Sequence, residues 1–383
     1  MNSKDKIYDV VVIGAGFAGL STAWYLSKKD AALKIAVLEH DKKLGGHASG
    51  RNAGMLRQAV SDPILAALAI EGRKLVGKCG KLGWKNIDLK SNGSLLLANH
   101  DKWEELRKTA SALNKSSIAY RWFSRDDSIK RVPLLENGDF KRGLFCESDA
   151  TVEIEPLLRG FYQQLKRSGQ SVFLGCSLKS IYKRENGFHM VAGDRSLIAR
   201  KVVNAAGAWA GVVAVKAGAS RVPLTAYRRH LFTSKTFRGL NKSWPFVWDL
   251  SHDFYFRPQG NTLLLSACDK GKIKNVEKAI QKENTDLKIE KTLRRKLDKF
   301  SSEFKPIKIQ SAKSGLRTMT PDGRFVIGED SKLKGFYWVA GLGGHGVTTS
   351  FSVGNLASDL ILGRKYDKKI ARALSPERFL DST

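Results

Sequence analysis

The chain has 383 residues, of which 42% are hydrophobic and 27% are charged, a content that supports a buried core and excludes both a disordered chain and a small disulfide-stapled module. This length suits two domains, or one domain with a large insertion. The 66 basic and 37 acidic residues give a formal net charge of +29 at pH 7, and because the lysines are scattered among acidic residues we expect a solvated basic surface, with docking to nucleic acid or to an anionic bilayer as the alternative.

The first predicted element is a buried strand over residues 10–13, whose continuous apolar and β-branched run is typical of a parallel sheet. A glycine motif of Gly14, Gly16 and Gly19 follows directly, and a helix is expected over residues 17–27. In dinucleotide-binding folds such glycines permit the tight turn, the approach of backbone to a pyrophosphate and the packing of the helix on the strand. The segment therefore predicts a dinucleotide site rather than an ordinary strand–turn–helix start.

A second apolar strand, over residues 34–38, ends at Glu39, whose carboxylate can accept hydrogen bonds from both hydroxyls of an adenosine ribose. Another glycine-rich loop follows, and its bare backbone and polar side chains suit a flavin better than a nicotinamide. The expected cofactor contacts of this loop are Gly46, Ser49, Arg51, Asn52 and Ala53. The sequence thus predicts FAD as the bound dinucleotide.

Further along the chain, two kinds of pattern alternate. The predicted elements are, in chain order, strands at residues 94–97, 202–204 and 253–257, Lys-rich helical patterning over 276–300, a strand at 336–340 and a closing helix over about 347–362. The strands at 202–204 and 336–340 are short buried runs, and we expect them in the same sheet as the first strand. The other two strands alternate in polarity and belong to a second region.

Two stretches without Lys, Arg, Asp or Glu, at residues 10–27 and 336–358, contain clustered glycines that argue against membrane-spanning helices. No convincing signal peptide precedes them. Four isolated cysteines have no metal-ligand spacing: Cys79, Cys146, Cys176 and Cys268. We expect reduced thiols, no metal and a cytoplasmic protein, with peripheral binding at the inner face of a membrane as the alternative that the basic charge leaves open.

Besides the glycine motif, four segments carry a family resemblance. They are residues 202–209 (VVNAAGAW), 254–258 (FYFRP), 315–323 (GLRTMTPDG) with 326–328 (VIG), and 335–346 (GFYWVAGLGGHG). On these segments the chain resembles the D-amino-acid oxidase-like family of FAD-dependent oxidoreductases, which includes glycine oxidase, sarcosine oxidase and D-amino-acid dehydrogenases. Within that family it is most similar to D-arginine dehydrogenase-like proteins.

The resemblance implies an α/β fold with a discontinuous, Rossmann-like FAD-binding domain and an inserted mixed-sheet α+β substrate domain. The FAD-binding domain is expected at residues 1–85, 148–220 and 316–383, and the substrate domain at residues 86–147 and 221–315. Non-covalent FAD is expected, although His47 near the flavin loop keeps covalent attachment open. The resemblance adds further cofactor contacts, at Leu178, Gly207, Gly343, Gly344, Gly346, Val347 and Thr348.

The reaction that the resemblance implies is oxidation of the C–N bond of a small amino acid or amine, such as a D-amino acid, glycine or an N-methyl amino acid. Hydride passes to flavin N5, and the imine is hydrolysed to an oxo acid. Oxygen or a quinone-type compound is the expected electron acceptor. The alternatives are a hydroxy-acid or glycerol-phosphate-type dehydrogenase and an RNA-modifying flavoenzyme, which the absence of an RNA-binding motif disfavours.

Four residues are the catalytic candidates that follow from the same resemblance. Arg317 is expected to bind the substrate carboxylate bidentately, with Arg229 as a second clamp. An ion pair between Arg317 and Asp322, and Arg228 in the place of Arg229, are the alternatives. Tyr255 is either a substrate-covering aromatic or a half-buried strand residue. His345 either orients the flavin or a water, or fills a tight turn.

Departures from the D-arginine pattern bear on the substrate. Met55 stands where that pattern has an active-site histidine, and Val60 where it has a lid tyrosine. Gly93 and Ser94 stand where an acid would bind a guanidinium. Because an unpaired buried guanidinium is costly, neutral substrates are expected to react better than D-arginine. A preference for D-arginine would require an unplaced acid, such as Glu71 or Asp88, to reach the pocket.

Overall fold

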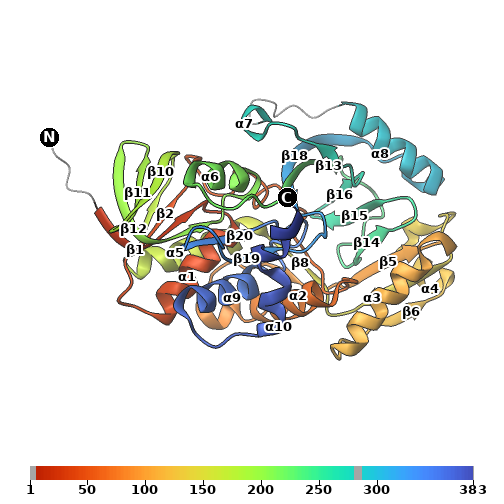
Figure 1. Ribbon diagram of the computed structural model, residues 1–383. Helices are drawn as coiled ribbons and strands as arrows, with labels where there is room; N and C mark the ends of the chain where they lie inside the picture. Colours follow the sequence, from red (N-terminus) through yellow and green to blue (C-terminus); the bar gives the residue numbers. More distant parts are fainter. Residues whose placement is uncertain (1–5, 280–286, 383) are drawn as a thin grey trace.

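The computed structural model describes residues 6–279 and 287–382, and it contains two large sheets flanked by helices (Figure 1). The first sheet has eight strands, with parallel strands β9, β2, β1, β12 and β20 at its centre. They are β1 (Lys6–Ile13), β2 (Ile35–Leu38), β9 (Ser171–Phe173), β10 (Leu178–Arg184), β11 (Gly187–Ala192), β12 (Arg195–Asn204), β19 (Val326–Glu329) and β20 (Phe336–Ala340). The strands β10, β11 and β19 run antiparallel at its margins.

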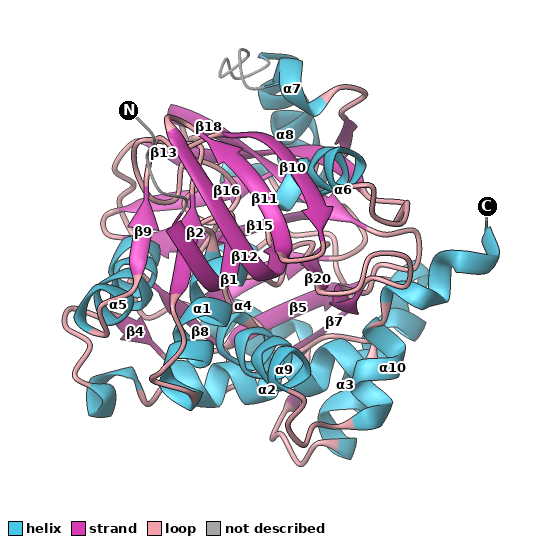
Figure 2. Cartoon of the chain, turned by 60° about the vertical axis from the view of Figure 1, so that its left-hand side comes forward, coloured by secondary structure: helices cyan, strands magenta, loops and turns pink. Residues whose placement is uncertain are grey.

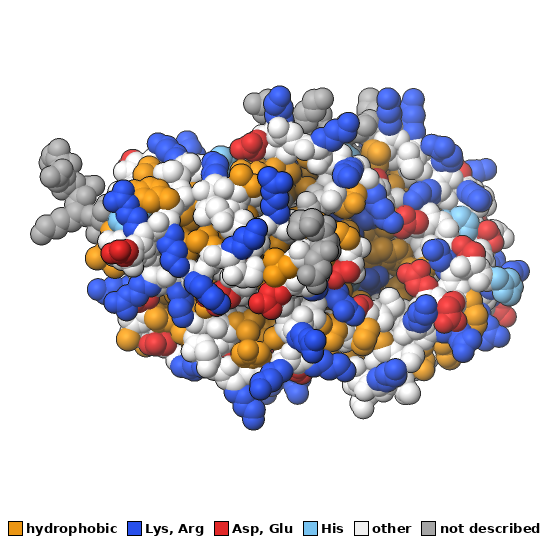
Figure 3. Space-filling model, in the orientation of Figure 1, with side chains coloured by type: hydrophobic (Ala, Val, Ile, Leu, Met, Phe, Trp, Pro, Cys, Tyr) orange, Lys and Arg blue, Asp and Glu red, His pale blue; other side chains and the backbone are white. Residues whose placement is uncertain are grey.

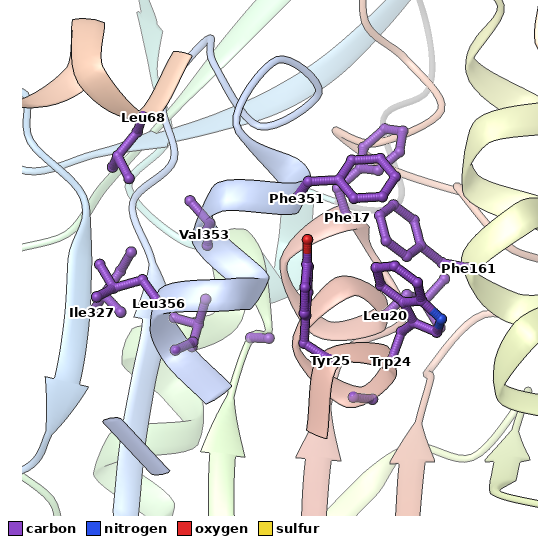
Figure 4. Packing of buried hydrophobic residues seen from close by; sticks show 14 of the residues in the cluster. Phe17, Leu20, Trp24, Tyr25, Leu68, Phe161, Ile327, Phe351, Val353 and Leu356 are labelled. Atoms are coloured by element: carbon purple, nitrogen blue, oxygen red, sulfur yellow. The ribbon is translucent and has the colours of Figure 1, made fainter. Parts of the chain in front are cut away.

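Helices cover one face of this sheet with apolar and aromatic side chains (Figures 2 and 4). They are α1 (Phe17–Lys29), α2 (Pro63–Val76), α5 (Ile154–Arg167), α9 (Ser350–Leu362) and α10 (Lys368–Leu374). The rings of Trp24, Phe161 and Phe351, one from each of three helices, lie 4.7–5.6 Å apart between centroids. The opposite face packs against α6 (Ala210–Ala217). Because both faces are covered, the central strands can be apolar throughout.

The second sheet has nine strands, in the order β17-β13-β16-β15-β14-β5-β7-β6, with β18 paired to β13. They are β5 (Ser94–Ala98), β6 (Arg121–Phe123), β7 (Arg142–Cys146), β13 (Thr225–Ser234), β14 (Phe246–Asp249), β15 (Phe254–Gln259), β16 (Thr262–Ser266), β17 (Gly271–Lys272) and β18 (Ile309–Met319). The other helices are α3 (Trp103–Lys115), α4 (Arg125–Arg131), α7 (Val276–Ala279) and α8 (Leu287–Phe300). A three-stranded sheet joins β3 (Met55–Leu56), β8 (Ala150–Val152) and β4 (Leu89–Lys90).

The mixed α/β architecture confirms the predicted fold class, and each strand predicted from periodicity is present. The observed strands β1 and β12 begin earlier than predicted, at Lys6 rather than residue 10 and at Arg195 rather than residue 202. The closing helix begins at Ser350 rather than near residue 347, because residues 344–349 form turns. The Lys-rich patterning over 276–300 forms α7 and α8, and residues 280–286 of it lie outside the described residues. The domain division stays a prediction: the strands of the second sheet fall between residues 94–146 and 225–319, so β18 crosses the expected boundary after residue 315.

The surface and the cysteines follow from composition. Basic side chains are spread over the face seen in Figure 3, with acidic side chains among them. All four cysteines are buried free thiols. Within residues 6–279 and 287–382, no helix has the length and hydropathy needed to cross a bilayer.

The contact between α1 and α9 generates a stability prediction. A Cβ on Gly354 would lie 2.6 Å from the backbone carbon of Ser21, so Gly354→Ala should force the two helices apart and destabilise the fold by about 1–3 kcal/mol. The matched control is Gly211→Ala in α6, where a Cβ would meet nothing within 4 Å and the helix propensity of Ala should add up to about 1 kcal/mol. Thermal unfolding of both variants checks the prediction, and equal melting temperatures would contradict it.

Candidate active site

A cavity of about 530 Å³ extends from the first sheet to the second. Its first part is lined by the loops that leave β1, β2, β12 and β20, all of which are parallel. The carboxyl ends of parallel strands meet at one edge of a sheet, and ligands bind in the crevice outside that edge. Its second part is lined by side chains of β13, β14, β15 and β18. The two parts are called here the nucleotide end and the substrate end.

The glycine turn at the nucleotide end has no room for side chains. Gly14 has φ +106°, and a Cβ there would lie 2.4 Å from the carbonyl oxygen of Ala205. A Cβ on Gly19 would lie 1.9 Å from the carbonyl oxygen of Gly14, which shows that the helix packs directly on the turn. The amide of Phe17, at the start of α1, donates to Ser49 Oγ at 3.0 Å. Gly16, Phe17 and Ala18 at this helix start line the cavity, which is where a phosphate would bind at a helix N-terminus.

The carboxylate of Glu39 is held at the end of β2 by backbone donors. The amide of Ala15 donates to Oε2 at 2.7 Å, and the amide of Asp41 donates to Oε1 at 3.0 Å. Burial raises the pKa of Glu39, while these two backbone hydrogen bonds oppose the shift. The group lines the cavity and has lone pairs left for ribose hydroxyls.

Most residues predicted to bind the cofactor line this cavity. They are Gly14, Gly16, Glu39, Gly46, Ser49, Arg51, Asn52, Ala53, Leu178, Gly207, Gly343, Gly344, Gly346 and Val347. Gly19 lies beneath the turn, and Thr348 lies outside the lining. The Thr348 hydroxyl accepts from the Arg57 amide at 3.2 Å and donates to the carbonyl of Met55 at 3.2 Å, so it holds two loops together. His47 contacts Asp41 at 3.3 Å and packs on Trp209.

At the substrate end, strand register places two arginines side by side. In the antiparallel pair of β13 and β18, Tyr227 lies opposite Arg317 and Arg229 lies opposite Gly315. Since Arg229 is two residues from Tyr227, it shares the face of Arg317 and is its diagonal neighbour. Both line the cavity. Arg228 points to the other face, where it donates to Ser314 Oγ and to the carbonyl of Ala279.

Neither arginine of this pair is neutralised by a protein carboxylate. Among the described residues, Nε and Nη1 of Arg229 are buried and have no hydrogen-bond partner. Burial, together with the charge of Arg229, lowers the pKa of Arg317 to about 10. Asp322, the alternative partner of Arg317, instead pairs with Arg378 at 2.8 Å. Buried guanidinium groups in this state favour an anionic ligand.

Tyr255 lies near the two arginines, whose charges act on it. Its side chain is 3% exposed and lines the cavity, and its ring lies 5.0 Å from that of Trp248. Burial raises the pKa of Tyr255, although Arg317 and Arg229 oppose this. The hydroxyl therefore stays protonated at neutral pH and can donate a hydrogen bond. Around it, Ala53, Leu231 and Cys268 form an apolar wall.

His345 also lines the cavity, within the turn that follows β20. Burial, and then the charges of Arg57 and Arg317, lower the pKa of His345 to about 3. Its imidazole is therefore neutral at physiological pH. Its backbone takes part in the turn as well, since its amide donates to the carbonyl of Leu342 and its carbonyl accepts from Thr349. His345 therefore lines the cavity and also helps to form the turn after β20.

Sequence reasoning missed Arg57 and Trp248. The Arg57 guanidinium lies over the Trp248 ring, 4.4 Å from its centroid, and both side chains line the cavity. A signal for Arg57 was available, because Met55 was already a pocket candidate and residues two apart along a strand share a face. Trp248 carried no local signal, since it enters the cavity only through the pairing of β14 with β15.

Of the four residues that depart from the D-arginine pattern, only Met55 lines the cavity. Met55 lines it, but Val60 is 6% exposed within the apolar core, and Gly93 and Ser94 lie outside the lining. The Ser94 hydroxyl donates to the buried carboxylate of Asp149 at 2.7 Å. Glu71 and Asp88 are outside the lining as well. The apolar character expected for the substrate pocket therefore depends on Met55 and on the apolar residues around Tyr255.

Similarity to known proteins agrees with this geometry. Residues 9–360 match the family model described as DAO, FAD dependent oxidoreductase, so the chain belongs to this family. Human mitochondrial sarcosine dehydrogenase is 24% identical over 374 residues, which cover 93% of this chain and 40% of that protein. Glycine oxidase of Bacillus licheniformis is 24% identical over 381 residues, covering 97% and 98%. The structure of L-proline dehydrogenase from P. horikoshii superposes with a TM-score of 0.86 at 20% identity, covering 99% of each chain.

The chain is therefore an FAD-dependent oxidoreductase, and FAD is its cofactor. The nucleotide end fits this group. The side-chain-free turn at Gly14 and the open start of α1 suit a pyrophosphate, and the lone pairs of Glu39 suit a ribose.

Glu39→Ala should weaken FAD binding roughly 10- to 100-fold, because hydrogen bonds to a charged group contribute about 1.5–3 kcal/mol. Fluorescence titration of the apoprotein with FAD measures the change. The control is Asp9→Ala on the same sheet, which removes a carboxylate that binds the Lys34 amide at 2.9 Å and lies outside the cavity. Equal FAD affinity in the two variants would argue against the ribose role.

Proposed function

We propose that this protein oxidises the C–N bond of a small amino acid or N-substituted amino acid, such as a D-amino acid, glycine or an N-methyl amino acid. The product is an imine that water hydrolyses to an oxo acid and an amine. The observation that carries this proposal is the pair of Arg229 and Arg317, whose guanidinium groups face the cavity without a protein carboxylate.

The residues of the chain bind, orient and desolvate the substrate. Arg317 and Arg229 bind the carboxylate with charge-assisted hydrogen bonds, and the Tyr255 hydroxyl adds a neutral donor. The apolar wall of Ala53, Leu231 and Cys268 limits water around the reacting carbon. When bound, FAD accepts the hydride that leaves the α-carbon as the nitrogen loses its proton. Water then adds to the imine carbon and the amine departs.

The positive charges of these arginines also bear on which side chain the substrate can carry. The ionised side chains closest to Arg317 are other arginines, and no carboxylate among the described residues pairs with them. A substrate with a cationic side chain would meet repulsion and no partner, so D-arginine is disfavoured. Glycine and glycolate, assayed side by side, separate amine oxidation from the hydroxy-acid alternative, and turnover of glycolate alone would overturn the proposal.

The electron acceptor is proposed to be oxygen or a quinone-type compound. Oxygen uptake and quinone reduction, measured on the same holoenzyme with the same substrate, separate an oxidase from a dehydrogenase. Nucleic acid is not a proposed partner, because the basic side chains in Figure 3 are spread over the surface rather than gathered in a groove.

Arg317→Ala should leave FAD bound but reduce kcat/KM for carboxylated substrates roughly 30- to 3000-fold, because loss of a buried charge partner costs about 2–5 kcal/mol. Arg317→Lys should restore only part of the activity, since Lys cannot bind bidentately. The matched control is Arg228→Ala, which removes a neighbouring arginine that faces away from the cavity. A wild-type kcat/KM in Arg317→Ala would show that Arg317 does not bind the substrate carboxylate.

The pH dependence follows from the neutral histidine. A His345 with a pKa of about 3 stays a neutral imidazole between pH 5 and 9, so its titration adds no change to the pH profile in that range. We expect kcat/KM to rise with pH until the substrate ammonium is deprotonated, because only the neutral amine can expel a hydride. His345→Asn should keep the shape of this profile. A limb near pH 6–7 that disappears in His345→Asn would contradict the neutral state.

A further inference from the structure

Arg57 is a third arginine at the substrate end of the cavity, and the proposed oxidation gives it no role. It follows β3, and its guanidinium is held over the Trp248 ring at 4.4 Å. Among the described residues, no hydrogen bond or ion pair within 4.0 Å joins this guanidinium to a carboxylate. Burial lowers the pKa of Arg57, and the first group that opposes this is Asp149. A charge kept in such a place needs a counter-ion.

Asp149 accounts for only part of this charge. One of its oxygens accepts from the amide and the side chain of Gln58, at 2.7 and 3.2 Å, and the other accepts from Ser94 at 2.7 Å. It lies behind Gln58, outside the cavity lining. Three guanidinium groups and one buried carboxylate leave a surplus of two positive charges at the substrate end. A monocarboxylic substrate balances one of them.

The position of Arg57 separates it from the clamp formed by Arg229 and Arg317. Those two come from adjacent strands of one sheet, whereas Arg57 comes from the small sheet of β3, β4 and β8. The Trp248 ring contacts Arg57 on one side and lies 5.0 Å from the Tyr255 ring on the other. Stacking on Trp248 fixes the guanidinium plane, which prepares it to bind a planar carboxylate. The positive charges at the substrate end therefore come from two separate parts of the fold.

Among the described residues, the acidic side chains that line the cavity lie away from these arginines. They are Glu39 and Asp41 at the nucleotide end, and Glu277, an exposed residue of α7, which contacts the turn formed by η4 (Gly207–Trp209). None of them contributes to the shifted pKa of Arg57 or Arg317. The nearest other acid for Arg57, Glu105, is exposed and pairs with Lys102 at 3.7 Å. The surplus charge is thus left for a ligand.

We propose that the substrate carries two carboxylates, one bound by Arg317 and Arg229 and the other by Arg57. The substrate class is then an aminodicarboxylic acid, in which the second carboxylate is on the side chain or on the nitrogen substituent. This inference rests on the proposed function for its chemistry, which it leaves unchanged: Arg57 takes part in binding and not in the transfer of hydride or protons.

The test compares isosteric pairs in which only the second charge differs. Wild-type holoenzyme is assayed with glutamate against glutamine and aspartate against asparagine, in both stereochemical forms, and with iminodiacetate against its monoamide. We expect kcat/KM to favour the acidic member of at least one pair by roughly 10- to 100-fold. In Arg57→Met this ratio should fall toward one through a rise in KM for the acid, and Arg57→Lys should restore part of it.

Two controls separate this role from others. Arg73→Met removes an arginine that also feels the charge of Asp149 but lies outside the cavity, and it should leave the ratio unchanged. Equal losses for acid and amide in Arg57→Met, accompanied by a shift in the reduction potential of the bound flavin, would place Arg57 on the cofactor and overturn the proposal. A preference for the amide in every pair that reacts would overturn it as well.

A binding measurement distinguishes failure of this inference from failure of the proposed function. Glutarate and butyrate cannot be oxidised as amines, and their binding is followed through the visible absorption of the bound flavin. Glutarate should bind roughly 10-fold or more tightly than butyrate, and Arg57→Met should remove the difference. If this holds while no amine is oxidised, the second carboxylate site stands and the proposed reaction falls. If amines are oxidised but glutarate has no advantage, only the present inference falls.

Discussion

The pairing of β13 with β18 is the interaction on which the substrate end depends. Its register puts Tyr227 opposite Arg317 and thereby sets Arg229 on the same face. A register shift of β13 by one residue would move Arg229 to the opposite face of the sheet and bring Arg228 to the cavity, because successive side chains of a strand alternate between faces. The two sheets meet at the cavity, so this one register decides which of the two arginines of β13 faces the space beside the nucleotide end.

That charge is costly for the protein when no ligand is bound. Nε and Nη1 of Arg229 are buried without partners, and burial lowers the pKa of both Arg317 and Arg57. Asp149, itself satisfied by Gln58 and Ser94, offsets a part of it from behind the wall. The remaining cost is stored in the pocket and is recovered only when an anion binds, which favours carboxylated substrates over neutral amines.

The nucleotide end obeys a different constraint, which is space rather than charge. The turn at Gly14 lies against the carbonyl of Ala205 and under Gly19, so backbone groups themselves form the binding surface. Glu39 is positioned by two backbone amides of the same edge. Because both ends are built on the loops and strands around one cavity, the cofactor and the substrate are brought together there.

The sequence by itself determined the dinucleotide site, because its signals are local: a strand, a glycine turn and an acid after the next strand follow one another within 30 residues, from residue 10 to residue 39. The motif around Arg317 likewise sufficed to select that residue. Tertiary structure decided what no local pattern carries. It chose Arg229 over Arg228, paired Asp322 with Arg378, and moved Val60 and Ser94 away from the cavity. It also brought Arg57 and Trp248 together across 191 positions of the chain, since charge and aromatic contacts depend on distance in space.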